Sequence, residues 1–162
     1  MENSYAELIK KIHTYFRSSR LKLSVAESCT GGLVGHLLTT QPGASEFFDS
    51  SVVSYSAESK IKLLGIKKSL IQRYGTISEE TARAMAYAIR KKRKTEFSLS
   101  ITGNLGPKPA EEKKVGLVFM AVDWEKETIS RGMIFDGDRE AVKYAAAMAS
   151  LRFLGEVVEV WA

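Results

Sequence analysis

The stretch that decides the fold is LKLSVAESCTGGLVGHLL, residues 21–38. Its first part places apolar residues alternately, at Leu21, Leu23 and Val25, which predicts a β-strand. Its last part repeats apolar residues at helical spacing, so the AESCTGG segment between them must turn sharply from strand to helix. Two adjacent glycines allow the backbone N–H groups of this turn to approach a ligand closely, and the N-terminus of the following helix carries partial positive charge. Because two hydroxyls and one thiol lie on the same turn, we expect the chemistry of this protein to occur here.

The rest of the chain alternates helical and extended patterns. Helices are predicted over residues 4–18, 31–40 and 57–64, as a short turn at 70–71, after a cap at Ser78, and after Gly137-Asp138. Strands are predicted over residues 21–26, 47–55, 97–101, 115–122 and 128–135. The short polar turn between the last two strands predicts one antiparallel strand in an otherwise parallel sheet, hence a layered α/β domain.

Three of the predicted strands end in polar or glycine residues. Ser28, Tyr55 and the pair Thr102-Gly103 each lie at a strand's carboxyl end. Open sheets of this kind bind ligands beyond the carboxyl ends of their parallel strands. We therefore expect a single cleft to collect these residues.

Composition narrows the class of protein. The 162 residues are 44% hydrophobic, which suits one domain spanning residues 1–162. Lys+Arg of 24 against Asp+Glu of 19 gives a net charge of +5, which favours anionic partners such as phosphorylated metabolites or nucleic acid. A single cysteine excludes an internal disulfide, and the amino-terminal residues lack a signal-peptide pattern. We therefore expect a cytoplasmic protein that does not associate with membranes, and no metal site, because the two histidines and the cysteine lack ligand spacing.

The strongest run of charge is Arg90–Lys94. It could contact a nucleic-acid backbone, but no aromatic residues are interleaved for base stacking. We favour a solvated last helical turn whose cations complement the helix dipole. A small-molecule partner is therefore expected rather than nucleic acid, and the oligomeric state stays open, a homodimer included.

A serine nucleophile requires a base. His13 lies in the first predicted helix and is expected at the surface or in packing, and His36 is expected in solvent. Lys60 is the alternative base if it is neutral, since it lies next to the inward-facing side of its helix. A thiol at a helix N-terminus has a lowered pKa, so Cys29 competes with Ser28, and the residues alone do not decide between them. Ser28 as a turn residue and Thr30 as a helix cap are an equally simple interpretation.

Six motifs in order resemble the C-terminal domain of the competence/damage-inducible protein CinA, a family whose stand-alone form is nicotinamide-nucleotide amidohydrolase. They are AESCTGG at 26–32, VSYS at 53–56 with Lys60, GTISEE at 75–80, ITG at 101–103 with Gly106-Pro107, Val115-Gly116, and GDR at 137–139.

The resemblance implies a three-layer α/β/α fold of the anticodon-binding-domain-like type, with a mixed, mostly parallel five-stranded sheet. It also implies hydrolysis of nicotinamide mononucleotide to nicotinate mononucleotide and ammonia, in pyridine nucleotide salvage and NAD metabolism, with no cofactor. Carried over by position, Ser28 would be the nucleophile, Lys60 its general base, and Tyr55 a hydroxyl that orients or relays the proton.

The remaining expected site residues would bind substrate. The backbone of Cys29, Thr30 and Gly31 would hold the oxyanion, and Gly32, Thr102, Gly103 and Arg139 are candidates for binding phosphate. The loop at 104–114 departs from the family's pattern after Gly-Pro. The alternative is therefore a non-catalytic nucleotide-binding or interaction module of the same family.

Overall fold

The computed structural model describes residues 2–160, with side chains from residue 5 onward. One sheet holds its strands in the order β2-β1-β3-β4-β5. Their bounds are β1 Leu23–Glu27, β2 Phe48–Val53, β3 Phe97–Gly103, β4 Leu117–Trp124 and β5 Thr128–Ile134. β1 runs parallel to β2 and β3, whereas β4 runs antiparallel to both of its neighbours. The prediction of one antiparallel strand in an otherwise parallel sheet is confirmed.

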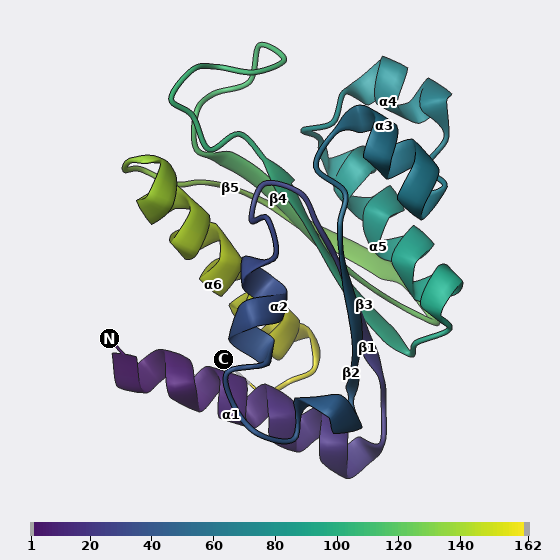
Figure 1. Ribbon diagram of the computed structural model, residues 1–162, viewed down its shortest axis with the longest axis vertical. Helices are drawn as coiled ribbons and strands as arrows, with labels where there is room; N and C mark the ends of the chain where they lie inside the picture. The colour runs from purple at the N-terminus through teal and green to yellow at the C-terminus, as the bar shows by residue number, and fades with distance from the viewer. Residues whose placement is uncertain (1, 161–162) are drawn as a thin grey trace.

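Helices cover both faces of this sheet (Figure 1). One face carries α1 (Glu2–Ser19), α2 (Leu33–Leu38) and α6 (Arg139–Val157). The other carries α5 (Glu79–Arg93), with α3 (Ala57–Ser59) and α4 (Lys68–Tyr74) beside it. This is the predicted three-layer α/β/α arrangement. Of the helices within residues 2–160, none combines the length and the apolar character needed to cross a bilayer.

The two faces of the sheet are packed differently. All five residues of β1 are buried, as expected for a strand with a neighbour on each side and helices on both faces. Val25 belongs to the larger apolar core under α1, α2 and α6, while Ala26 packs with Met85 and Ile89 of α5. Successive β1 side chains therefore face opposite layers.

The segment predicted as one helix over 57–64 contains two kinds of turn. The α-helical residues Ala57–Ser59 are followed by a π-helix, η2, over Lys60–Leu64. Ser56 caps the start through a reciprocal pair of hydrogen bonds with Ser59. The wider π-turn begins at Lys60, whose side chain is fully buried.

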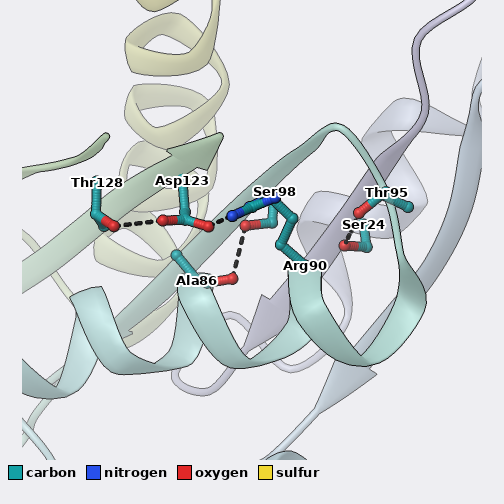
Figure 2. Close-up of polar contacts among 7 residues, drawn as sticks. All are labelled: Ser24, Ala86, Arg90, Thr95, Ser98, Asp123 and Thr128. Atoms are coloured by element: carbon teal, nitrogen blue, oxygen red, sulfur yellow. Dashed lines mark hydrogen bonds and ion pairs between the residues drawn. The ribbon is translucent and has the colours of Figure 1, made fainter. Parts of the chain in front are cut away.

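The last turn of α5 is largely solvated, as expected, since Lys91, Lys92, Arg93 and Lys94 are exposed, but Arg90 departs from the expectation. Arg90 forms an ion pair with Asp123 of β4, which also accepts a hydrogen bond from Thr128 (Figure 2). Arg93 pairs with Asp49 at 2.7 Å. Two of the run's five cations are therefore bound to carboxylates, and Arg90 contacts the sheet rather than solvent.

Hydroxyls of β1, of β3 and of the segment that links α5 to β3 add further polar contacts beside α5. Ser98 donates to the carbonyl of Ala86 at 2.7 Å, and the hydroxyls of Ser24 and Thr95 lie 2.8 Å apart (Figure 2). These groups are buried and hydrogen-bonded. Ser98 therefore ties α5 to β3, and Ser24 ties the segment after α5 to β1.

Candidate active site

The carboxyl ends of the parallel strands meet at one edge of the sheet, beneath the loop that links β3 to β4 (Figure 1, upper end). A pocket of about 420 Å³ opens there. The expected site residues that line it are Ser28, Cys29, Tyr55, Thr102, Gly103 and Arg139. Residues 104–110 form its rim. The three strand ends thus share one cleft, as predicted.

Lys60 lies against the expected nucleophile. Its Nζ is 2.8 Å from Ser28 Oγ, 2.8 Å from the Ser54 carbonyl oxygen and 3.4 Å from the Tyr55 carbonyl oxygen. A neutral amine has two N–H groups and one lone pair. If both carbonyls accept N–H groups, the lone pair is left for the Ser28 hydroxyl. The contacts therefore suit a base paired with an alcohol.

Burial shifts the lysine toward the neutral form. The pKa of Lys60 falls from 10.5 to about 8 because the side chain is desolvated, and the electrostatic interactions with Cys29 and Glu111 oppose this shift only in part. At pH 7 a pKa of about 8 leaves roughly one amine in ten neutral, about 300-fold more than an unshifted lysine would have.

Cys29 has the opposite character. Burial raises the pKa of its thiol to about 12, and the charge of Lys60 only partly offsets this effect. The side chain is 4% exposed. The thiol therefore stays protonated at neutral pH, contrary to the expectation for a cysteine at a helix N-terminus, and Ser28 is the better-placed nucleophile.

The N-terminus of α2 is already occupied by the chain's own carboxylate. Glu27 accepts hydrogen bonds from the Thr30 hydroxyl at 2.6 Å and from the Gly32 N–H at 3.0 Å. Thr30 is fully buried. The Thr30 hydroxyl and the Gly32 N–H therefore bind Glu27 rather than a ligand, which corrects the expectation that Gly32 binds the substrate's phosphate at this helix end.

Other N–H groups of the turn have different partners. Gly31 donates to the carbonyl of Ser28 at 3.1 Å, so it too is engaged within the chain. Among residues 2–160, no carbonyl or carboxylate oxygen accepts from the N–H groups of Cys29 and Thr30. These two backbone donors lie next to Ser28 in sequence.

Tyr55 contributes two different atoms to the site. Its carbonyl oxygen lies at Lys60 and, at 3.5 Å, at Ser28 Oγ. Its phenol accepts a hydrogen bond from Arg139 at 2.8 Å and is largely exposed. Arg139 also donates to the Gly106 carbonyl at 2.5 Å. The Tyr55 hydroxyl thus lies at the pocket mouth with Arg139, and the backbone of Tyr55 holds the lysine.

Two expected residues at the end of β3, Thr102 and Gly103, line the pocket. Thr102 donates its hydroxyl to the Thr76 carbonyl at 2.7 Å. A Cβ at Gly103 would come within 2.7 Å of the Val118 side chain, so only glycine fits there.

The histidines lie outside the pocket. His13 is buried, with Nε2 2.8 Å from the Leu38 carbonyl and its ring edge-on to Phe47. His36 is exposed on α2. Both placements agree with the expectation of a packing and a solvent-exposed histidine.

The residues that hold the rim loop were not among those expected. The carboxylate of Glu111 accepts from the N–H of Thr76 at 2.9 Å and from the N–H of Ile77 at 3.1 Å. Burial alone would raise the pKa of Glu111, but these hydrogen bonds lower it below its ordinary value. Asn104, which is 6% exposed, accepts from the Gly106 N–H at 3.0 Å. The loop that departs from the family pattern is therefore fastened over the pocket.

Fold and pocket together define a three-layer α/β/α domain with a pocket at the carboxyl ends of its parallel strands. Residues 5–158 match the model of the CinA C-terminal domain. The chain belongs to this family.

Individual relatives agree with this assignment. A CinA-like protein of Kosmotoga olearia is 39% identical over 154 residues, which cover 94% of this chain and 37% of the relative. A CinA-like protein of Acidobacterium capsulatum is 40% identical over 151 residues, 92% of this chain and 36% of the relative. The chain thus spans about a third of the length of these curated relatives. The crystal structure of a competence or damage-inducible protein from Enterobacter asburiae is 33% identical with a TM-score of 0.92, covering 95% of this chain and 98% of that one.

Proposed function

We propose that this domain is an amidohydrolase that cleaves the carboxamide of nicotinamide mononucleotide, giving nicotinate mononucleotide and ammonia. The observation that carries the proposal is the 2.8 Å contact between Lys60 Nζ and Ser28 Oγ, with two backbone carbonyls at the same nitrogen. A buried lysine with a lowered pKa next to an alcohol is the arrangement that nucleophilic catalysis without histidine requires.

In the first step, neutral Lys60 takes the proton of Ser28 as its oxygen attacks the carboxamide carbon. The tetrahedral intermediate collapses by breaking the C–N bond, and protonated Lys60 returns the proton to the departing nitrogen. Ammonia leaves, and the nicotinoyl group is held as an ester of Ser28.

In the second step, water hydrolyses the ester, and Lys60 again accepts and then donates a proton. Lys60 accepts a proton from a water molecule that attacks the ester carbon. The bond from carbon to the serine oxygen then breaks, and Lys60 protonates Ser28. The products are a free carboxylic acid and the starting enzyme, so no oxidant, reductant or cofactor is consumed.

Negative charge forms on the carbonyl oxygen in both steps. Glu27 and Ser28 occupy the N–H groups of Gly32 and Gly31. The N–H groups of Cys29 and Thr30 face only the weakly accepting Cys29 sulfur, so we assign these two donors of the turn to the oxyanion. Two backbone donors beside the nucleophile form the usual oxyanion site of acyl transfer.

The pocket suits an anionic mononucleotide. Its volume of about 420 Å³ lies in the range of small-molecule sites. Arg139 and Lys108 line it, and both can bind phosphate. In this proposal the phosphate binds at these two side chains, toward solvent, and the amide lies at Ser28.

The test is ammonia release from nicotinamide mononucleotide, measured on the wild type, on Ser28→Ala and on Ser69→Ala. Ser69 is an exposed serine of α4 and serves as the matched control. We expect turnover by the wild type and the control and only background release by Ser28→Ala. Turnover that survives in Ser28→Ala would refute the proposal, and nucleotide binding without any turnover would indicate the non-catalytic alternative.

A further inference from the structure

Glu27, the residue directly before Ser28, has a fully buried carboxylate. The groups that donate to it are the hydroxyls of Thr30 and Ser51, at 2.6 and 2.7 Å, and the N–H groups of Gly32, Val34 and Gly35, at 3.0, 3.1 and 2.9 Å. We infer that Glu27 is a positioning residue that holds both members of the Ser28–Lys60 pair in register. This inference rests on the proposed function.

The first part of the argument concerns the nucleophile. Side chains alternate along β1, so Glu27 points toward α2 while Ser28 points toward Lys60 on the other side. Gly31 and Gly32 both have left-handed backbone, with φ of 61° and 102°. With this conformation the chain bends back so that the first turn of α2 donates to Glu27. The turn carrying Ser28 is thus closed by the carboxylate of its own neighbour.

The second part concerns the base. Ser51 of β2 donates to the same carboxylate. The carbonyl of Glu27 accepts the N–H of Ser54 at 2.8 Å, and the carbonyl of Ser54 is one of the two that hold Lys60. Glu27 therefore joins the turn that presents the alcohol to the segment that presents the amine.

The role requires an acceptor-only group. Both carboxylate oxygens accept only, and the five donors engage all of their roughly four lone-pair sites. A glutamine amide replaces one of these oxygens by an NH₂ that faces donors. The amide therefore leaves at least one N–H of α2 unsatisfied, and the turn shifts to relieve it. Misplacement of about 1 Å in a reacting group costs on the order of 100-fold in rate.

The test compares kcat and KM for nicotinamide mononucleotide in Glu27→Gln and in the matched control Glu58→Gln. Glu58 lies on α3, where it pairs with Lys62 in solvent, and its loss is expected to change neither constant. In Glu27→Gln we expect kcat to fall about 100-fold and KM to stay within about threefold. Thermal unfolding is measured on the same samples, so that the folded fraction at the assay temperature is known.

A kcat within about threefold of the wild type in folded Glu27→Gln would overturn the inference. So would a loss of kcat matched by the loss of folded protein. If Glu27→Gln does not fold, Ser51→Ala decides, since it removes one donor only. We expect roughly a fivefold lower kcat there, and an unchanged value would overturn the inference. The wild type and Ser28→Ala are run in the same assay. If the wild type does not turn over, or if Ser28→Ala does, the proposed function fails, which is a different result from an unchanged kcat in Glu27→Gln.

Discussion

The pH dependence of turnover tests the state of Lys60. With a pKa of about 8, the neutral fraction of the amine is roughly 0.09 at pH 7 and 0.9 at pH 9. Because the base must be neutral to accept the Ser28 proton, kcat/KM is expected to rise about tenfold over this interval. The midpoint should lie near pH 8, since kcat/KM reports the free enzyme.

The same shift predicts a change in stability. The pKa of Lys60 is lower in the folded protein than the ordinary 10.5, so between pH 8 and 10.5 the unfolded chain binds more protons. The free energy of unfolding should therefore rise across that window, by at most about 3 kcal/mol from this residue. Below pH 8 the charged, buried lysine weakens the fold, and above 10.5 its contribution is constant.

The assay is the initial rate of nicotinate mononucleotide formation at subsaturating substrate from pH 6 to about pH 11. Urea unfolding of the same protein gives the free energy at each pH. Lys62→Met is the control, because Lys62 is the exposed lysine two residues away. A rate that stays flat between pH 7 and 9, or that rises only near pH 10.5, would refute the argument that Lys60 acts as a base made neutral by burial.

Three further predictions concern other residues of the site and the fold. Cys29→Ala should keep kcat within a fewfold of the wild type, since a thiol with a pKa of about 12 supplies no nucleophile; abolished turnover in a folded variant would contradict this. Glu111→Gln should move the midpoint of the kcat/KM profile to lower pH, because a negative charge that raises the pKa of Lys60 is removed. A shift to higher pH would refute the assignment of this midpoint to Lys60. Asp123→Asn should lower the free energy of unfolding by about 3 kcal/mol, since it leaves Arg90 nearly buried without its carboxylate. Urea titration measures this loss, and an unchanged midpoint would show that the ion pair contributes nothing.

The local sequence pattern was sufficient to predict which strand ends and which turn form the pocket. The alternation before Ser28, the glycines after it and the ends of the other parallel strands follow from periodicity, and topology then brings those ends to one edge. Lys60 could be listed as a candidate base because it lies beside an inward-facing helix surface. Its full burial depends on a π-turn that no local pattern predicted.

Tertiary contacts decided what the sequence left open. Burial of Cys29 by distant elements, rather than its place in the turn, sets its pKa and favours Ser28. Occupation of the α2 N-terminus by Glu27 could have been suspected only from an acidic residue standing just before the turn. The pairing of Arg90 with Asp123 joins residues far apart in the chain, so the basic run gave no sign of it.

The account depends most directly on an ester at Ser28. Enzyme mixed with nicotinamide mononucleotide, quenched in acid within the first turnovers and digested, should yield a nicotinoyl-ribotide adduct on the peptide that contains residues 23–33, with fragmentation placing it on Ser28. The adduct should be absent from Ser28→Ala. An adduct on the thiol of Cys29, or steady ammonia release by Ser28→Ala, would contradict the account.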